Sequence, residues 1–152
     1  EIRLSLVGSE MCIRDSFTTM LEIDVTVGQP FVSQVLPRYD VSGIIGMSGD
    51  VIGSIVLSFP APVAEVVIGK FAGSACPVES ADFADALGEL VNMISGAAKA
   101  KFEGKKVSIS TPSVVVGPGH TIARSSRDVC VSLPCKAYCG EFSIDVAIRE
   151  GM

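Results

Sequence analysis

Residues 80–102 read SADFADALGELVNMISGAAKAKF, and this stretch decides the fold. Ser80 is suited to cap a helix, and Asp82 follows in the first turn, where a negative charge is favourable. Apolar residues recur at helical spacing and predict one buried face: Phe83, Leu87, Leu90, Val91, Ile94 and Ala98. The opposite face carries Asp85, Glu89, Asn92, Gly96 and Lys99. The stretch therefore predicts an amphipathic helix from Ser80 to about Phe102, closed by Gly104.

Upstream, residues 41–59 carry a single charge, Asp50, and are long enough to be considered as a membrane span. Four glycines interrupt them, and Gly49-Asp50 stands between two β-branched runs like a turn. The segment therefore predicts a hairpin, Asp40–Met47 with Val51–Phe59. A second helix is expected from about 61 to Phe71, with Gly73 ending it and a buried stripe of Val63, Val66, Val67 and Phe71.

Further strands are expected on both sides of these elements. Met20–Val27 alternates apolar and polar residues, with Leu21, Ile23, Val25 and Val27 on one face. Downstream, strand-like runs cover 107–110, 114–116, 128–133 and 142–148. The sequence predicts an α+β fold, in which a largely antiparallel sheet packs against two long helices.

Composition restricts the function classes. The 152 residues are 48% hydrophobic with a net charge of -5, which argues against a nucleic-acid or anionic-membrane surface. Five cysteines without paired spacing, and one histidine, His120, favour small buried hydrophobes in a reducing compartment over disulfides or a zinc site. His120 follows Gly117-Pro118-Gly119 and is expected to be a loop residue rather than a base. Residues 1–16 hold no apolar run typical of a secretory signal, so a cytoplasmic location is expected.

Glu89 and Asn92 are the candidate chemical groups. They lie three residues apart, so a helix places them side by side on its exposed face. An amide can hold a water molecule, and a neighbouring carboxylate can dock to a cation. Glu-x-x-Asn is also common on solvated helix faces, and that interpretation stays open on these two residues alone. The sequence contains no Walker loop, Gly-x-Ser-x-Gly or His-Glu-x-x-His motif.

The pattern Asp85-x3-Glu89-x2-Asn92, followed by Pro112, resembles the signature of the CheC, CheX and FliY phosphatases. The sequence ADALGELVNMISGAAKAKFEG is similar to the CheX branch in particular, and so is the stretch from Gly43 to Phe59. The resemblance runs from about residue 17 to residue 148. The spacing between Asn92 and Pro112 is slightly shorter than in the family, and the family's N-terminal helix is reduced to residues 17–20.

This resemblance implies a phosphatase that dephosphorylates the aspartyl phosphate of a CheY-like response-regulator receiver domain in chemotaxis or two-component signalling. Asn92 would orient the attacking water, and Glu89 would pair with the receiver's lysine. The chain itself would bind no cofactor, because the receiver supplies Mg2+. Asp85, Gly88 and Gly96 would form the docking surface, although Asp85 equally suits the positive end of the helix dipole. A homodimer formed through sheet edges is implied as well.

The first sixteen residues differ in character from the rest. The string SLVGSEMCIRDS within residues 1–16 resembles a peptide produced when sequencing-adaptor DNA is translated in frame with a broken gene. We therefore expect residues 1–16 to be a non-native scar, although a genuine strand and loop is the alternative. Residues 17–152 are expected to form a single domain.

Two other functions fit the same resemblance. A non-catalytic CheX-like adaptor would bind a receiver without hydrolysis, and a FliY-related module would serve in the flagellar switch. The intact Glu89 and Asn92 pair favours the enzyme, because an adaptor has no need of the amide.

Overall fold

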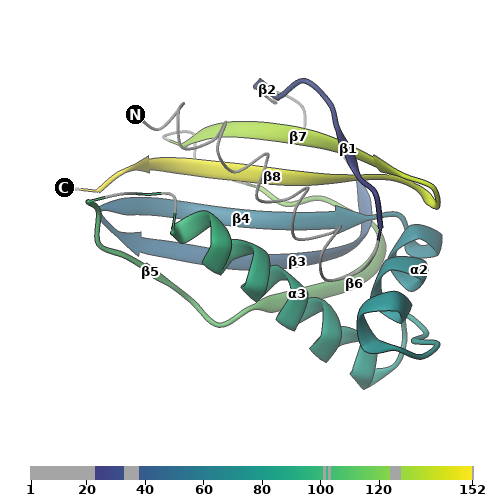
Figure 1. The fold of residues 1–152 in the computed structure, drawn as a ribbon. Helices are drawn as coiled ribbons and strands as arrows, with labels where there is room; N and C mark the ends of the chain where they lie inside the picture. Colours follow the sequence, from purple (N-terminus) through teal and green to yellow (C-terminus); the bar gives the residue numbers. More distant parts are fainter. Residues whose placement is uncertain (1–22, 33–37, 101, 103, 124–127, 152) are drawn as a thin grey trace.

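The computed structural model describes residues 23–32, 38–100, 102, 104–123 and 128–151. Figure 1 shows a broad curved sheet with helices lying against one of its faces. In chain order the elements are β1 Thr26–Val27, β2 Phe31–Val32, β3 Tyr39–Gly49, β4 Val51–Phe59, α2 Ala61–Ala72, α3 Ala81–Lys99, β5 Val107–Ile109, β6 Ser113–His120, β7 Val129–Ala137 and β8 Gly140–Glu150. The predicted α+β class and the antiparallel sheet are confirmed.

The sheet is built around two long hairpins that meet at its centre. Its strand order is β1-β7-β8-β4-β3-β5, with β2 also pairing with β7 and β6 also pairing with β3. Strands β3 and β4 pair from Val41 opposite Phe59 to Met47 opposite Gly53, which confirms the hairpin expected in this apolar segment. No helix within the described ranges is long and apolar enough to cross a membrane.

Helix α3 lies diagonally across the sheet, and α2 packs at the end where β4 finishes (Figure 1). Phe83, Leu87, Leu90, Val91, Ile94 and Ala98, the predicted apolar face, are all buried. The helix approaches β3 closely at Gly43, where an added Cβ would lie 3.2 Å from Val91 Cγ1 and 3.3 Å from Leu87 Cγ. A glycine in the strand therefore lets the helix settle directly onto the backbone of the sheet.

The start of α3 and the end of α2 carry the expected capping residues, whereas Ala100, and not Gly104, is the C-cap of α3. Ser80 accepts a hydrogen bond from the backbone N–H of Phe83, as an N-cap residue does. Gly73 ends α2 in the left-handed conformation, with φ of 78°. Pro60 offers α2 no side-chain cap, and Asp40 supplies one from β3 by accepting from the Ala61 N–H at 2.9 Å.

The buried stripe of α2 and the end of α3 differ from the sequence-based expectations. The buried residues of α2 are Val63, Ala64, Val67 and Ile68, whereas Val66 is 37% exposed and Phe71 half-buried. The stripe is therefore rotated from the predicted one, because α2 packs against both α3 and the sheet. Helix α3 ends at Lys99 instead of Phe102, and the buried Phe102 lies beyond it.

The first strand is also shorter than expected. Ile23, Val25 and Val27 are buried and alternate with exposed Asp24 and Thr26, so the alternation is confirmed over these residues. Of the described residues 23–27, Thr26 and Val27 alone pair with β7. The expectations for residues 1–22, including the scar and the reduced helix, lie outside the described residues.

Gly53 supports the central pairing of β4 with β8. Its φ is 153°, and a Cβ added there would lie 1.9 Å from the carbonyl oxygen of Ala147. We expect Gly53→Ala to lower the free energy of unfolding by about 3 kcal/mol, because it adds a clash with rigid backbone and an unfavourable φ. Urea unfolding followed by circular dichroism measures the change.

Gly96→Ala is the control for that measurement. An added Cβ at Gly96 meets nothing within 4 Å, so this variant should gain up to about 1 kcal/mol from helix propensity. A Gly53→Ala protein as stable as the unchanged chain would contradict the close approach.

Candidate functional site on helix α3

The exposed side of α3 carries the two candidate groups. Glu89 and Asn92 are both exposed, and Leu90 and Val91 between them are buried. The helix therefore cannot rotate these two side chains inward without exposing its apolar face. The predicted position of the pair, side by side on an exposed ridge, matches the structure.

Neither side chain is engaged by the part of the chain that the structure describes. Within the described residues, no hydrogen bond or ion pair involves the Glu89 carboxylate or the Asn92 amide. Asn92 is the only asparagine of the sequence. The carboxylate remains free to pair with an external cation, and the amide keeps both a donor and an acceptor for a water molecule.

The other three predicted docking residues are placed differently from one another. Asp85 is exposed on the same side of the helix, and Gly96 is half-exposed with open space around it. Gly88 is buried, and an added Cβ there would lie 3.3 Å from Pro112 Cγ. The segment between β5 and β6 therefore covers Gly88, and its predicted part in a docking surface stays a prediction.

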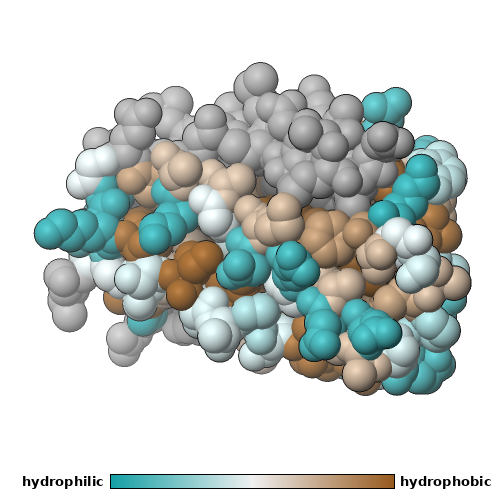
Figure 2. All heavy atoms as spheres, turned by 60° about the horizontal axis from the view of Figure 1, so that its bottom comes forward, coloured by the Kyte–Doolittle hydropathy of each residue, from teal (hydrophilic) through white to brown (hydrophobic). Residues whose placement is uncertain are grey.

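Met93 is an exposed apolar residue that sequence reasoning did not select. It follows Asn92 directly and is 39% exposed. Figure 2 turns the lower side of the Figure 1 view forward, and hydrophobic and hydrophilic residues are interspersed on it. An unbranched, polarisable side chain beside polar groups is typical of protein-binding surfaces. An apolar methionine on the polar side of the predicted helix was the sequence signal that could have identified this residue as part of a binding surface.

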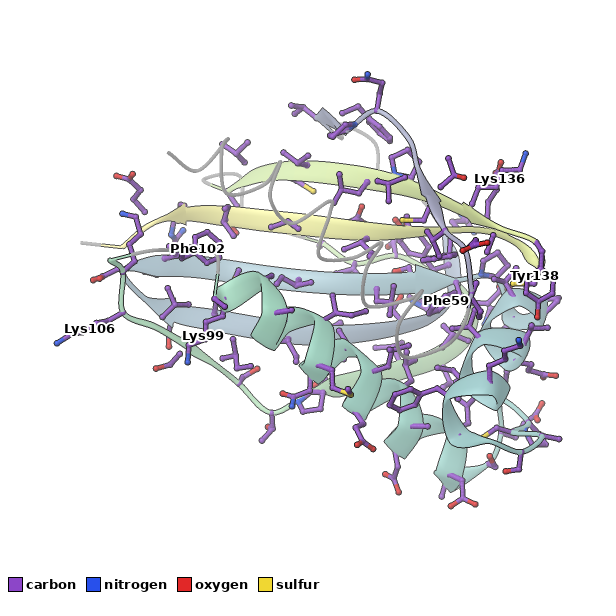
Figure 3. The ribbon with its side chains drawn as sticks, viewed as in Figure 1. Phe59, Lys99, Phe102, Lys106, Lys136 and Tyr138 are labelled. Carbon is purple, nitrogen blue, oxygen red and sulfur yellow. The ribbon has the colours of Figure 1, made fainter. Side chains whose placement is uncertain are left out.

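Positive charge gathers beyond the C-terminal end of the pair. Lys99 closes α3, and Lys106 lies at the same end of the molecule (Figure 3). Asp82, Asp85 and Glu89 place negative charge toward the N-terminal half of the helix. The exposed ridge is thus polarised along its length, acidic at one end and basic at the other.

Cysteines and His120 have other roles in the described part of the chain. Cys76, Cys130 and Cys135 are buried, and burial raises the pKa of the half-buried Cys139 thiol, which disfavours the nucleophilic thiolate. His120 was expected in a loop, but it is the last residue of β6. Its Nδ1–H donates to the Gly117 carbonyl at 2.7 Å while Nε2 lies 2.8 Å from Ser42 Oγ. Ser42 faces away from α3, because its neighbour Gly43 faces the helix. No cluster of three metal-ligating side chains occurs among the described residues.

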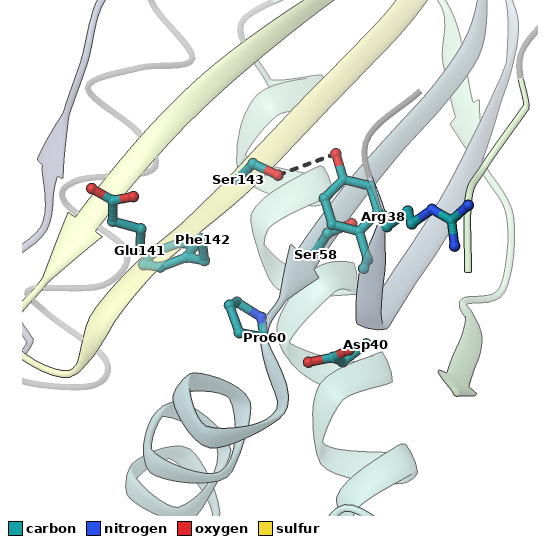
Figure 4. Close-up of a pocket in the computed structure, with 8 residues that line it drawn as sticks. Arg38, Asp40, Ser58, Pro60, Glu141, Phe142 and Ser143 are labelled. Atoms are coloured by element: carbon teal, nitrogen blue, oxygen red, sulfur yellow. Dashed lines mark hydrogen bonds between the residues drawn. The ribbon is translucent and has the colours of Figure 1, made fainter. Parts of the chain in front are cut away.

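A separate cavity of about 230 Å³ lies near the start of β8, and Figure 4 shows its lining. The lining residues come from β3, β4, β8 and the segments beside them: Arg38, Tyr39, Asp40, Ser58, Pro60, Glu141, Phe142 and Ser143. None belongs to α3. The candidate groups therefore lie apart from this cavity, on the exposed side of α3.

The sheet and the position of α3 match those of solved α+β domains of the CheC/CheX type, which is the class of this protein. The crystal structure of the chemotaxis protein CheX from Desulfovibrio desulfuricans is 31% identical, with a TM-score of 0.83 over 98% of this chain and 99% of that one. The structure of a CheX–CheY–BeF3–Mg2+ complex from Borrelia burgdorferi shares the fold, with a TM-score of 0.81 at 21% identity over 95% of this chain and 97% of that one.

Sequence comparison identifies the family. The family model "Chemotaxis phosphatase CheX" matches residues 41–136. The CheY-P phosphatase CheX of Thermotoga maritima is 29% identical over 152 residues, covering 97% of this chain and 95% of the relative. The chain belongs to the chemotaxis phosphatase CheX family.

The exposure of the pair leads to a stability prediction. Glu89→Ala and Asn92→Ala should each change the free energy of unfolding by less than about 0.5 kcal/mol, because neither side chain has a partner within the described structure. Leu90→Ala, between them on the buried face, should cost about 2–5 kcal/mol. Urea unfolding of the three variants compares them, and a large loss in Asn92→Ala would assign that residue to the core instead.

Proposed function

We propose that this protein accelerates hydrolysis of the aspartyl phosphate on a CheY-like receiver domain. One observation carries the proposal: Glu89 and Asn92 stand together on the exposed ridge of a helix whose other side is locked into the sheet. Membership of the CheX family and the name of the Thermotoga maritima relative, a CheY-P phosphatase, support the same reaction.

The proposed role of Asn92 is to orient water for in-line attack on the phosphoryl group. Phosphoryl transfer passes through a loose transition state, so positioning of the attacking water contributes more than covalent chemistry by the protein. An amide suits this task because its carbonyl oxygen accepts from the water while its NH2 group donates to a neighbouring oxygen. No nucleophile from this chain is needed.

The proposed role of Glu89 is to fix the docking geometry. Its exposed carboxylate is free to accept a charge-assisted hydrogen bond from the ammonium group of a receiver lysine. Mg2+ belongs to the receiver's side of the complex in this proposal, in line with the name of the Borrelia burgdorferi structure, which includes CheY, BeF3 and Mg2+. Asp85, Met93 and Gly96 would then form the surface around the pair, in the cytoplasm where receivers act.

The catalytic prediction separates the two groups. Asn92→Ala should abolish accelerated dephosphorylation while receiver binding persists, because the amide acts on water. Glu89→Ala should lower both rate and binding, because a charge-assisted contact is lost. Each loss should be on the order of 10²-fold or more in rate. The measurement follows phosphate loss from a phosphorylated receiver with Mg2+ over time.

Glu65→Ala is a matched control, since Glu65 is an exposed carboxylate on α2. It should leave the rate unchanged. Equal rates for wild type and Asn92→Ala would reject the catalytic role. A wild-type protein that binds the receiver without shortening its phosphate lifetime would establish the adaptor function instead.

We also propose a homodimer formed through sheet edges. Strand β6 lies at the edge of the sheet beside β3, and its Val116 is 45% exposed. Unpaired edges favour association with another strand, and isologous pairing of two copies would cover them. Light scattering should give twice the mass of a single chain. A single-chain mass at high protein concentration would contradict the dimer.

A further inference from the structure

The three residues between β5 and β6 are fastened to the sheet beside α3. Ser110 donates its backbone N–H to the Gly46 carbonyl, and its Oγ accepts from the Gly46 N–H, both at 2.9 Å. The same hydroxyl donates to the Thr111 carbonyl at 3.0 Å. Ser110 thereby fills the part of the β3 edge that lies between its pairing with β5 and its pairing with β6. These hydrogen bonds fix the connection, residues 110–112, which we call the ledge. Its three residues are nevertheless all exposed.

Pro112 carries this ledge onto the helix. Its Cγ and Cβ lie 3.3 Å and 3.6 Å from the point that a Cβ on Gly88 would occupy, and Val114 Cγ2 lies 3.8 Å from it. Glycine inside a helix costs about 1 kcal/mol relative to alanine, so its place here needs a reason. The close approach of Pro112 provides one, because the proline ring rests directly on the helix backbone.

Helix geometry brings Asn92 to the same place. Residues four apart lie on one face of a helix, with about 5–6 Å between their Cβ atoms. Side chains of a helix lean toward its N-terminus, so the side chain of residue 92 covers the turn that contains residue 88. The space over Gly88 toward which Asn92 leans is the space that Pro112 borders.

We propose that Pro112 is a positioning residue for Asn92, holding the amide in the orientation that places water; this rests on the proposed function above. The ring limits the rotamers open to the amide from one side. Proline also has no N–H, so the chain offers no backbone donor at position 112 to occupy the side-chain carbonyl oxygen of Asn92. The oxygen therefore stays available to the attacking water. Gly88 contributes to this positioning because, without a side chain, it leaves room for the proline ring against the helix.

The first test observes Asn92 without any receiver. Since the sequence has a single asparagine, selective 15N labelling gives one pair of side-chain amide signals. Pro112→Ala should shift these signals and lower their heteronuclear NOE. The control is Pro118→Ala, which changes an exposed proline within β6 and should leave both unchanged. Signals that are equally mobile in wild type and Pro112→Ala would overturn the inference.

The second test measures catalysis by varying the phosphatase concentration against a phosphorylated receiver. Pro112→Ala should lower the maximal rate about tenfold and change the half-saturating concentration less than about twofold, because orientation rather than docking is lost. Binding to a BeF3-activated receiver should likewise remain within about twofold. Pro118→Ala should match wild type in all three.

Gly88→Ala provides an independent variant that leaves the ledge sequence intact. Its methyl group would press on Pro112 Cγ at 3.3 Å, so it should lower the maximal rate in the same direction, while alanine favours the helix itself. Unchanged maximal rates in both variants, or losses explained wholly by weaker binding, would overturn the positioning role while wild-type acceleration upholds the proposed function. If wild type itself fails to accelerate phosphate loss, both fall together.

Discussion

The burial of one side of α3 against the sheet is the contact on which the rest of the molecule depends. Phe83, Leu87 and Leu90 are each at most 1% exposed, and burying a side chain of this kind is worth about 1.5–3 kcal/mol. Turning the helix by one residue, about 100°, would expose this face and drive the unpartnered Glu89 carboxylate inward, which is far more costly. The packing therefore fixes which two polar groups face outward and holds them on a rigid element.

A second constraint acts across the sheet edge. Strand β3 pairs with β5 over Met47–Gly49 and with β6 over part of its first half, and Ser110 joins the two pairings at Gly46. The chain leaves the sheet after Ser110 and returns at Ser113, and between them Pro112 reaches α3 at Gly88. Helix and ledge are distant in sequence, and the edge of one strand brings them together.

Sequence patterns predicted the features that depend on a residue's own character. Helical period identified α3, its cap at Ser80 and its exposed pair, and β-branched runs around Gly49-Asp50 identified the central hairpin. These patterns failed where contact with a residue distant in sequence determines whether a side chain is buried. Gly88 has no side chain whose hydropathy could reveal its burial, which Pro112 imposes. Val66 is as apolar as Val67, and only the direction from which α3 and the sheet approach α2 distinguishes them.

The shape of the site explains why so little chemistry is visible in this chain alone. The cavity near the start of β8 lies among β3, β4 and β8, whereas Glu89 and Asn92 are exposed on α3. The exposed side of a helix cannot exclude water or concentrate charge by itself, but it can enter a cavity on another protein. If the phosphate and its metal ion lie in that cavity, the ridge needs only to deliver an oriented amide and a docking carboxylate. The rigidity of the helix and of its two side chains then matters more than their reactivity. Conformational freedom that these side chains lack before docking does not have to be lost in the transition state. The locked face of α3 and the ledge at Pro112 both act in that direction.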